Sequence, residues 1–61
     1  MFRVRVRTQG EEKFVENALR FETVEDAKTY GKDLSERWTI VEEWDVRDDN
    51  GKLFYWTEVL R

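Results

Sequence analysis

The stretch TVEDAKTYGKDLSERW, residues 23–38, decides the fold because it holds the strongest local signal in the chain. Thr23 is followed three residues later by Asp26, the spacing at which a hydroxyl and a carboxylate satisfy the free amides at a helix start. Gly31 lies near the apolar face of this helix and predicts close packing of the helix against the sheet. That face follows helical spacing at Val24, Ala27, Tyr30, Leu34 and Trp38.

Two strands are expected before the helix. Residues 2–8, FRVRVRT, alternate apolar side chains with arginines, which is typical of a strand with one buried and one exposed face. After a polar break, KFVENALRF at residues 13–21 reads as a second strand. A hairpin with a four-residue loop predicts two cross-strand pairs, Val6 with Val15 and Arg5 with Glu16.

The residues after the helix, WTIVEEWDVRDDNGKLFYWTEVLR at 38–61, predict a second hairpin that turns at Asn50-Gly51. A two-residue turn would set Trp44 opposite Thr57, so we favour a type I turn in which Gly51 is a left-handed bulge residue. The favoured register pairs Asp48 with Lys52, Val46 with Phe54, Trp44 with Trp56, and Ile40 with Leu60.

This register also sets Glu42 opposite Glu58 on the apolar face, which is unfavourable if both carboxylates are buried and charged. A β-bulge at Glu42 and Glu43 that turns Val41 inward would remove the conflict. We therefore expect an irregularity in this strand.

The element order ββαββ predicts a single α+β domain, residues 1–61, with one helix on one face of a four-stranded sheet made of two hairpins. Strand order 2-1-4-3 would put the first and last strands side by side. That arrangement resembles the immunoglobulin-binding domain of protein G and the β-grasp group in element order. The expected core is Val4, Val6, Leu19, Phe21, Ala27, Tyr30, Leu34, Trp38, Trp44, Val46, Phe54, Trp56 and Leu60.

The composition limits the classes of function. Eleven basic and 14 acidic residues give a net charge of −3, so no general attraction to nucleic acid or to anionic membranes is expected. The chain has neither cysteine nor histidine, which excludes disulfides and typical zinc sites. No apolar run is long enough for a membrane span. A cytoplasmic location is expected.

No pattern for catalysis is present. Ser35 is the only serine and has no imidazole to act as its base, and the three glycines are scattered singly. The stretch around Asn50 lacks the first and last carboxylates of a calcium loop. Glu42 and Glu58 could form a carboxylate pair, but nothing else of a sugar-cleaving site accompanies them. We expect a non-enzyme without catalytic residues, cofactor, metal site or small-molecule substrate.

The open face of the sheet is the candidate partner surface, because the arginines of residues 2–8 lie on it when Val4 and Val6 face the helix. Exposed apolar residues beside them mark a contact site. We therefore expect a small interaction or accessory protein that binds a protein partner, or itself as a homodimer, through the open face or an edge strand. The candidate partner-binding residues are Arg3, Arg5, Arg7, Phe14, Val41, Leu53, Tyr55 and Val59.

Two other hypotheses remain open. Arg3, Arg5 and Arg7 with Tyr55 could bind single-stranded nucleic acid, although a cross-strand ladder of paired charges explains the same arginines. Residues 42–49, EEWDVRDD, hold five carboxylates and could imitate DNA to inhibit a host enzyme.

Residues 19–38 carry a pattern in which a Phe-x-Thr cap leads into a Glu-Asp-Ala helix that ends in an aromatic residue. The pattern resembles short uncharacterised proteins encoded by bacteriophages and other mobile elements. The resemblance implies an accessory protein in the cytoplasm of a host cell, directed at a host component, and it assigns no functional residue. The matching residues are Phe21, Thr23, Glu25, Asp26, Ala27, Tyr30, Leu34 and Trp38.

Overall fold

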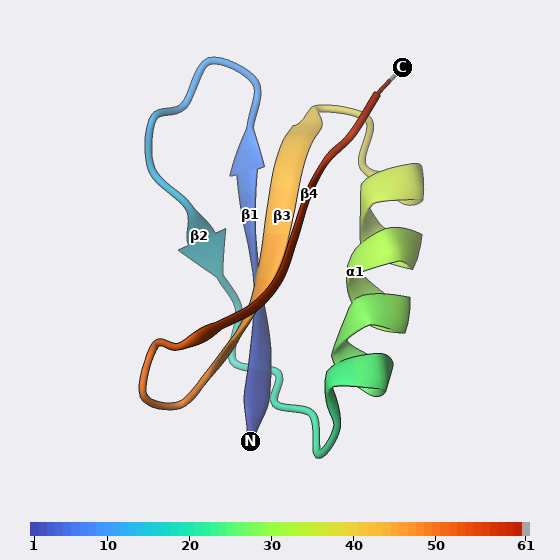
Figure 1. Ribbon diagram of the computed structural model, residues 1–61. Coiled ribbons are helices and arrows are strands. Elements are labelled where there is room, and N and C mark those ends of the chain that lie inside the picture. Colours follow the sequence, from blue (N-terminus) through green and yellow to red (C-terminus); the bar gives the residue numbers. More distant parts are fainter. Residues whose placement is uncertain (61) are drawn as a thin grey trace.

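The computed structural model describes residues 1–60 and shows one helix packed on a four-stranded antiparallel sheet (Figure 1). The elements in chain order are β1 (Phe2–Thr8), β2 (Val15–Glu16), α1 (Val24–Arg37), β3 (Val41–Asp48) and β4 (Leu53–Glu58). This confirms the predicted ββαββ order and the α+β fold. No helix among these residues is long and apolar enough to cross a membrane.

The strand order is β2-β1-β3-β4, so the order 2-1-4-3 was wrong. β1 pairs antiparallel with β3, and β4 lies at the edge beyond β3. The reason is the short link after the helix: only residues 38–40 separate α1 from β3. Three residues span at most about 10 Å, so β3 enters the sheet beneath the helix and beside β1.

The first hairpin has the predicted register, because Val6 pairs with Val15 and Arg5 pairs with Glu16. β2 is nevertheless two residues long rather than the expected nine. The side-chain oxygen of Asn17 accepts a hydrogen bond from the amide of Leu19 at 3.0 Å, a local turn that competes with strand pairing. The chain approaches β1 again only at its start, where Phe2 and Phe21 pair through their backbones.

α1 begins at the predicted cap, where the Thr23 hydroxyl accepts a hydrogen bond from the amide of Asp26 at 3.0 Å. Gly31 is buried on the side of the helix that faces the Trp44 ring of β3. A Cβ atom at Gly31 would lie 2.4 Å from carbon atoms of the Trp44 ring, so no larger residue fits without movement. Close packing of helix on sheet is therefore the reason for this glycine.

β3 contains the predicted bulge. Arg7 pairs with Glu43 and Thr8 pairs with Val41, so Glu42 is the extra residue between them. Val41 turns inward and is only 1% exposed. The bulge thus buries an apolar side chain and leaves the Glu42 carboxylate partly exposed.

The turn of the second hairpin also forms as expected. Asp48 donates its amide to the carbonyl of Lys52 and accepts from the amide of Gly51, each at 3.0 Å, and Gly51 has a φ of 86°. The Asp48 carboxylate accepts hydrogen bonds from the amides of Lys52 and Asn50, and these bonds lower its pKa. The side chain of Asp48 therefore stabilises the turn.

Beyond the turn, the predicted register was wrong. Arg47 pairs with Leu53, but Val46 pairs with Tyr55, so Phe54 is a second bulge residue. The bulge gives two aromatic rings contacts on the helix side, because Phe54 packs edge-on against Phe2 and Tyr55 packs on Trp44, both with centroids 5.2 Å apart. The remaining pairs are Trp44 with Thr57, Asp45 with Trp56 and Glu43 with Glu58.

The core lies between α1 and the two central strands. Its buried members are Val4, Val6, Ala27, Val41, Trp44 and Val46. Five expected core residues are exposed instead, because the register shift turns Trp56 away from α1 and the others lie in loops, at a bulge or past a strand end. They are Leu19, Trp38, Phe54, Trp56 and Leu60. Tyr55 and Val59 pack against the core in their place.

Candidate protein-interaction surface

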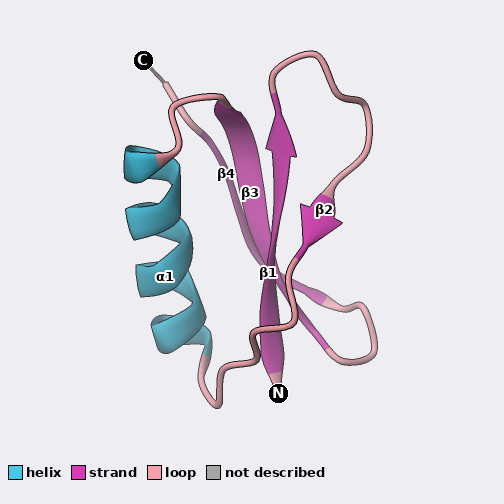
Figure 2. Cartoon of the chain, turned by 180° about the vertical axis from the view of Figure 1, so that it is seen from behind, coloured by secondary structure: helices cyan, strands magenta, loops and turns pink. Residues whose placement is uncertain are grey.

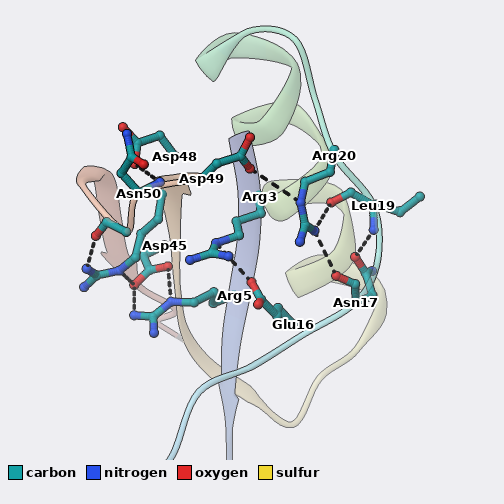
Figure 3. A network of polar contacts seen from close by, with 12 residues as sticks. Arg3, Arg5, Glu16, Asn17, Leu19, Arg20, Asp45, Asp48, Asp49 and Asn50 are labelled. Atoms are coloured by element: carbon teal, nitrogen blue, oxygen red, sulfur yellow. Dashed lines mark hydrogen bonds and ion pairs between the residues drawn. The ribbon is translucent and has the colours of Figure 1, made fainter. Parts of the chain in front are cut away.

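Arg3, Arg5 and Arg7 lie on the face of the sheet away from α1, as predicted, and each is held by a carboxylate. The Arg5 guanidinium binds both oxygens of Asp45, at 3.0 and 2.6 Å (Figure 3). Arg3 Nε lies 3.3 Å from a carboxylate oxygen of Glu16, an ion pair without hydrogen-bond alignment. The arginine stripe is therefore a ladder of paired charges.

Asp45 is the centre of this ladder. Its side chain is 1% exposed, and Arg47 Nε approaches one of its oxygens at 3.3 Å in addition to Arg5. The hydrogen bond to Asp45 raises the pKa of Arg5 above its ordinary value. Two guanidiniums on one carboxylate supply the partners that a buried charge requires.

Glu43 is the second anchor of the ladder. Its carboxylate accepts hydrogen bonds from the indole of Trp56 at 2.7 Å and from Arg7 Nε at 2.5 Å. The indole bond, followed by the bond from Arg7, lowers the pKa of Glu43. The same arginine lies 3.0 Å from Glu42. Trp56 is thereby fixed to the open face while 47% of it stays exposed.

The margin of this face near the chain start is also ion-paired. Arg20 Nε lies 3.7 Å from the carboxylate of Asp49 (Figure 3). The same carboxylate also binds the N-terminal amine of Met1 at 3.1 Å. Arg20 further donates to the backbone carbonyls of Asn17 and Leu19. These contacts hold the segment between β2 and α1 close to the second hairpin.

Phe14 lies on the open face as predicted, and the Arg5 guanidinium covers its ring at 4.5 Å. Leu53 also keeps its predicted place opposite Arg47 and is 48% exposed. Trp56 was missed as a surface residue because the favoured register placed it in the core. The register of the two-residue turn, which we did not favour, sets Trp56 opposite Asp45, and the structure has this pair.

Three candidate residues do not lie on the open face. Val41 is buried by the bulge in β3. Tyr55 faces α1, where it packs on Trp44 and lies under the Lys28 ammonium at 4.5 Å. Val59 is half-buried against the core. Their placement was wrong because one bulge in each of β3 and β4 reverses the alternation of side chains, for Val41 before the bulge in β3 and for Tyr55 and Val59 after the bulge in β4.

β4 is an edge strand with few features that block pairing. The two sheet edges differ: β2 is two residues long, whereas β4 runs for six residues, LFYWTE. Within β4 there is no proline or lysine, and Glu58 is its one charged residue. Proteins commonly protect the edge of a sheet with proline, lysine or other charged residues, or with a very short edge strand. The outer edge of β4 is thus suited to pairing with another strand.

The exposed apolar side chains of β4 accompany this free edge. Leu53, Phe54 and Trp56 are each between 42% and 48% exposed. Because the Val59 amide donates to the carbonyl of Glu42 on β3, strand alternation points the amides of Glu58 and Trp56 outward. Both backbone and side chains of β4 are therefore available to a partner.

A groove runs beside β4 on the helix side. α1 packs mainly on β1 and β3 and lies along one side of the sheet (Figure 2). A helix is about 10 Å wide and neighbouring strands lie about 4.8 Å apart, so one helix covers mainly two strands and leaves β4 only partly covered. The groove between α1 and β4 has a volume of about 470 Å³. Trp44, Tyr55 and Val59 line it from the sheet, and Lys28 and Lys32 line it from the helix.

No protein-family model, curated protein or solved structure matches the chain. The resemblance to bacteriophage proteins therefore stays a prediction.

Proposed function

We propose that this chain is a non-catalytic interaction protein whose β4 edge binds an extended strand of a protein partner. The observation that carries the proposal is the unprotected edge: β4 spans six residues, pairs with another strand on one side only, and exposes Leu53, Phe54 and Trp56. Strand addition gives affinity through main-chain hydrogen bonds and specificity through alternate side chains. Pairing with a second copy of the chain uses the same edge.

The open face supports a nucleic-acid function less well. A phosphate backbone would have to compete with Asp45, Glu43 and Glu16 for arginines that are already ion-paired. Tyr55, the residue expected to stack on bases, faces α1 rather than the open face. We therefore favour a protein partner over single-stranded nucleic acid.

The acidic stretch at residues 42–49 supports DNA imitation less well for the same reason. Asp45 is buried, Glu43 is bound to Trp56 and Arg7, and Asp48 accepts amides of its own turn. A DNA mimic needs carboxylates that are free to meet a basic partner. Most of these carboxylates have internal partners.

The test compares two substitutions at one position of β4. Glu58→Pro removes an outward amide and adds a ring to the outer edge, while leaving the inward bonds of β4 to β3 in place. Glu58→Ala removes the same side chain but keeps the amide. Urea unfolding first establishes that both variants fold.

A random heptapeptide library displayed on phage is then selected against the wild type and both variants. We expect peptides to be enriched on the wild type and on Glu58→Ala, and at least tenfold less on Glu58→Pro. Concentration-dependent sedimentation that Glu58→Pro abolishes would instead identify a second copy as the strand. Equal enrichment on all three proteins, or a monomer that enriches no peptide, would overturn the proposal.

A further inference from the structure

The wall of the groove beside β4 carries charges of both signs. On α1, Glu25 lies one helical turn before Lys28, so two opposite charges are neighbours on the helix surface. Glu36 follows Lys32 by one turn in the same way. With Glu58 of β4, the groove lining has three carboxylates and two ammonium groups. Ion pairing therefore does not select what enters the groove.

The floor of this groove is apolar. Trp44, Tyr55 and Val59 line it from the sheet, and the rings of Trp44 and Tyr55 pack together with centroids 5.2 Å apart. The Lys28 ammonium lies 4.5 Å from the centre of the Tyr55 ring, so this charge already has a cation–π contact. The volume of about 470 Å³ leaves room above the floor for a large side chain. An uncharged apolar side chain is the occupant that fits.

The other face of β4 is apolar as well. Leu53 and Trp56 lie on the open face and are 48% and 47% exposed. The indole of Trp56 donates a hydrogen bond to Glu43 at 2.7 Å, which fixes the ring on that face. Aromatic rings pair favourably with aromatic and β-branched side chains of a neighbouring strand. A strand added to β4 would therefore meet apolar side chains on both of its faces.

Such a strand would lie about 4.8 Å beyond β4 and direct alternate side chains to the two faces of the sheet. Strands that are buried on both faces have nearly continuous apolar sequences, whereas half-exposed strands alternate. We infer that β4 recognises a run of consecutive apolar residues in another protein. Every second side chain of the run lies above the groove floor, and the others lie beside Leu53 and Trp56. The inference rests on the proposed function of β4.

A second copy of this chain fits the groove less well. The helix-side rings of its β4 are already packed within their own copy, Tyr55 on Trp44 and Phe54 edge-on against Phe2. Rings held in this way are not free to fill the groove of another copy. A foreign segment, whose side chains have no such contacts before binding, is the occupant that fits.

The experiment uses the same displayed heptapeptide library, with the enriched sequences aligned and read by position. Selection on the wild type should enrich large apolar residues at least threefold over the unselected library at three or more consecutive positions. Enrichment at alternate positions only, with polar residues between them, would overturn the inference.

Two substitutions at adjacent residues assign the two faces. Trp56→Lys places an ammonium group on the open face, and Thr57→Lys places one at the groove, which Thr57 lines. Each variant should replace the apolar preference by Asp or Glu at alternate positions, and the two variants should do so at opposite sets of positions. Because the introduced group is the same, each variant is the control of the other. A new charge preference is a gain that an unfolded variant cannot produce.

Two altered peptides measure the contribution of each face to affinity for the wild type. Serine at one groove-side position of the most enriched peptide should weaken binding at least fivefold. Serine at one open-face position should also weaken binding at least fivefold. Unchanged affinity after either replacement would mean that one face of the strand is not recognised, and would overturn the inference.

The outcomes separate the two claims. Peptides that are lost on Glu58→Pro, but that alternate apolar with polar residues or respond to both lysine variants at the same positions, would overturn this inference and leave the proposed function intact. Absence of any enrichment on the wild type would overturn both.

Discussion

The centre of the sheet and its β4 edge differ in how completely their side chains find partners. At the centre, Val46 and Asp45 are at most 1% exposed, one packed beneath α1 and the other bound by arginines. At the edge, Leu53 and Trp56 are close to half exposed and the outer backbone pairs with no strand among residues 1–60. We infer that substitutions in the centre change stability, whereas substitutions at the edge change binding.

The largest effect is expected at the contact between helix and sheet. Gly31→Leu should lower the free energy of unfolding by more than about 3 kcal/mol, because even a Cβ there would lie 2.4 Å from the Trp44 ring. Small domains have only a few kcal/mol to lose, so urea unfolding should show a largely unfolded protein. Glu36→Leu, on an exposed position of the same helix, is the control. Equal stability of Gly31→Leu and the wild type would contradict the close packing.

A smaller loss is expected when the central carboxylate is removed. Asp45→Ala leaves the Arg5 and Arg47 guanidiniums without their shared partner and should lower the free energy of unfolding by about 2 kcal/mol. The loss is smaller than for a fully buried ion pair because both arginine side chains reach solvent. Asp33→Ala breaks the exposed pair with Arg37 and should cost less than about 0.5 kcal/mol. Equal effects of the two substitutions in urea titrations would show that burial of Asp45 is unimportant.

Acid should weaken the fold through Glu43 and Asp48, whose pKa values are both lowered by hydrogen bonds. The pKa of a free Glu carboxyl, as in the unfolded chain, is about 4.3. A carboxyl whose pKa is lower in the folded state stabilises the fold at pH values above its unfolded pKa, and this contribution is lost as the pH falls through the folded pKa. NMR titration should show that Trp56→Phe, which lacks the indole donor, raises the pKa of Glu43. An unchanged pKa in that variant would mean that the indole bond does not form in solution.

The smallest effect on stability is expected at the β4 edge. Leu53→Ser replaces a half-exposed side chain and should change the free energy of unfolding by less than about 0.5 kcal/mol. It should nevertheless weaken binding of a selected peptide, because an apolar contact of the edge is lost. A loss of stability comparable to that of Asp45→Ala would show that the edge belongs to the core.

Local patterns in the sequence predicted the elements, the Thr23 cap, the close packing at Gly31 and the bulge that buries Val41. Each depends on residues that are near in sequence or on a conflict visible within one strand. The bulge at Phe54 was not predictable in this way. Phe54 contacts the ring of Phe2, which lies 52 positions earlier in the sequence, and no local pattern indicates such a contact.

The candidate surface was predictable in part for the same reason. The alternation of residues 2–8 placed the arginines on the open face, and cross-strand charges indicated their pairing. One register shift then exchanged the positions of Tyr55 and Trp56, because side chains on a strand alternate between its faces. The strand order further depended on where β3 enters the sheet beneath α1.

Amide hydrogen exchange of β4 tests most directly whether this edge receives a strand. The account predicts that the outward amides of Trp56 and Glu58 exchange rapidly in the free protein and slow at least tenfold when a selected peptide is bound. The inward amide of Val59, bonded to β3, should stay protected in both states. Protection that appears instead at the amides around Phe14, with Trp56 and Glu58 unchanged, would contradict it.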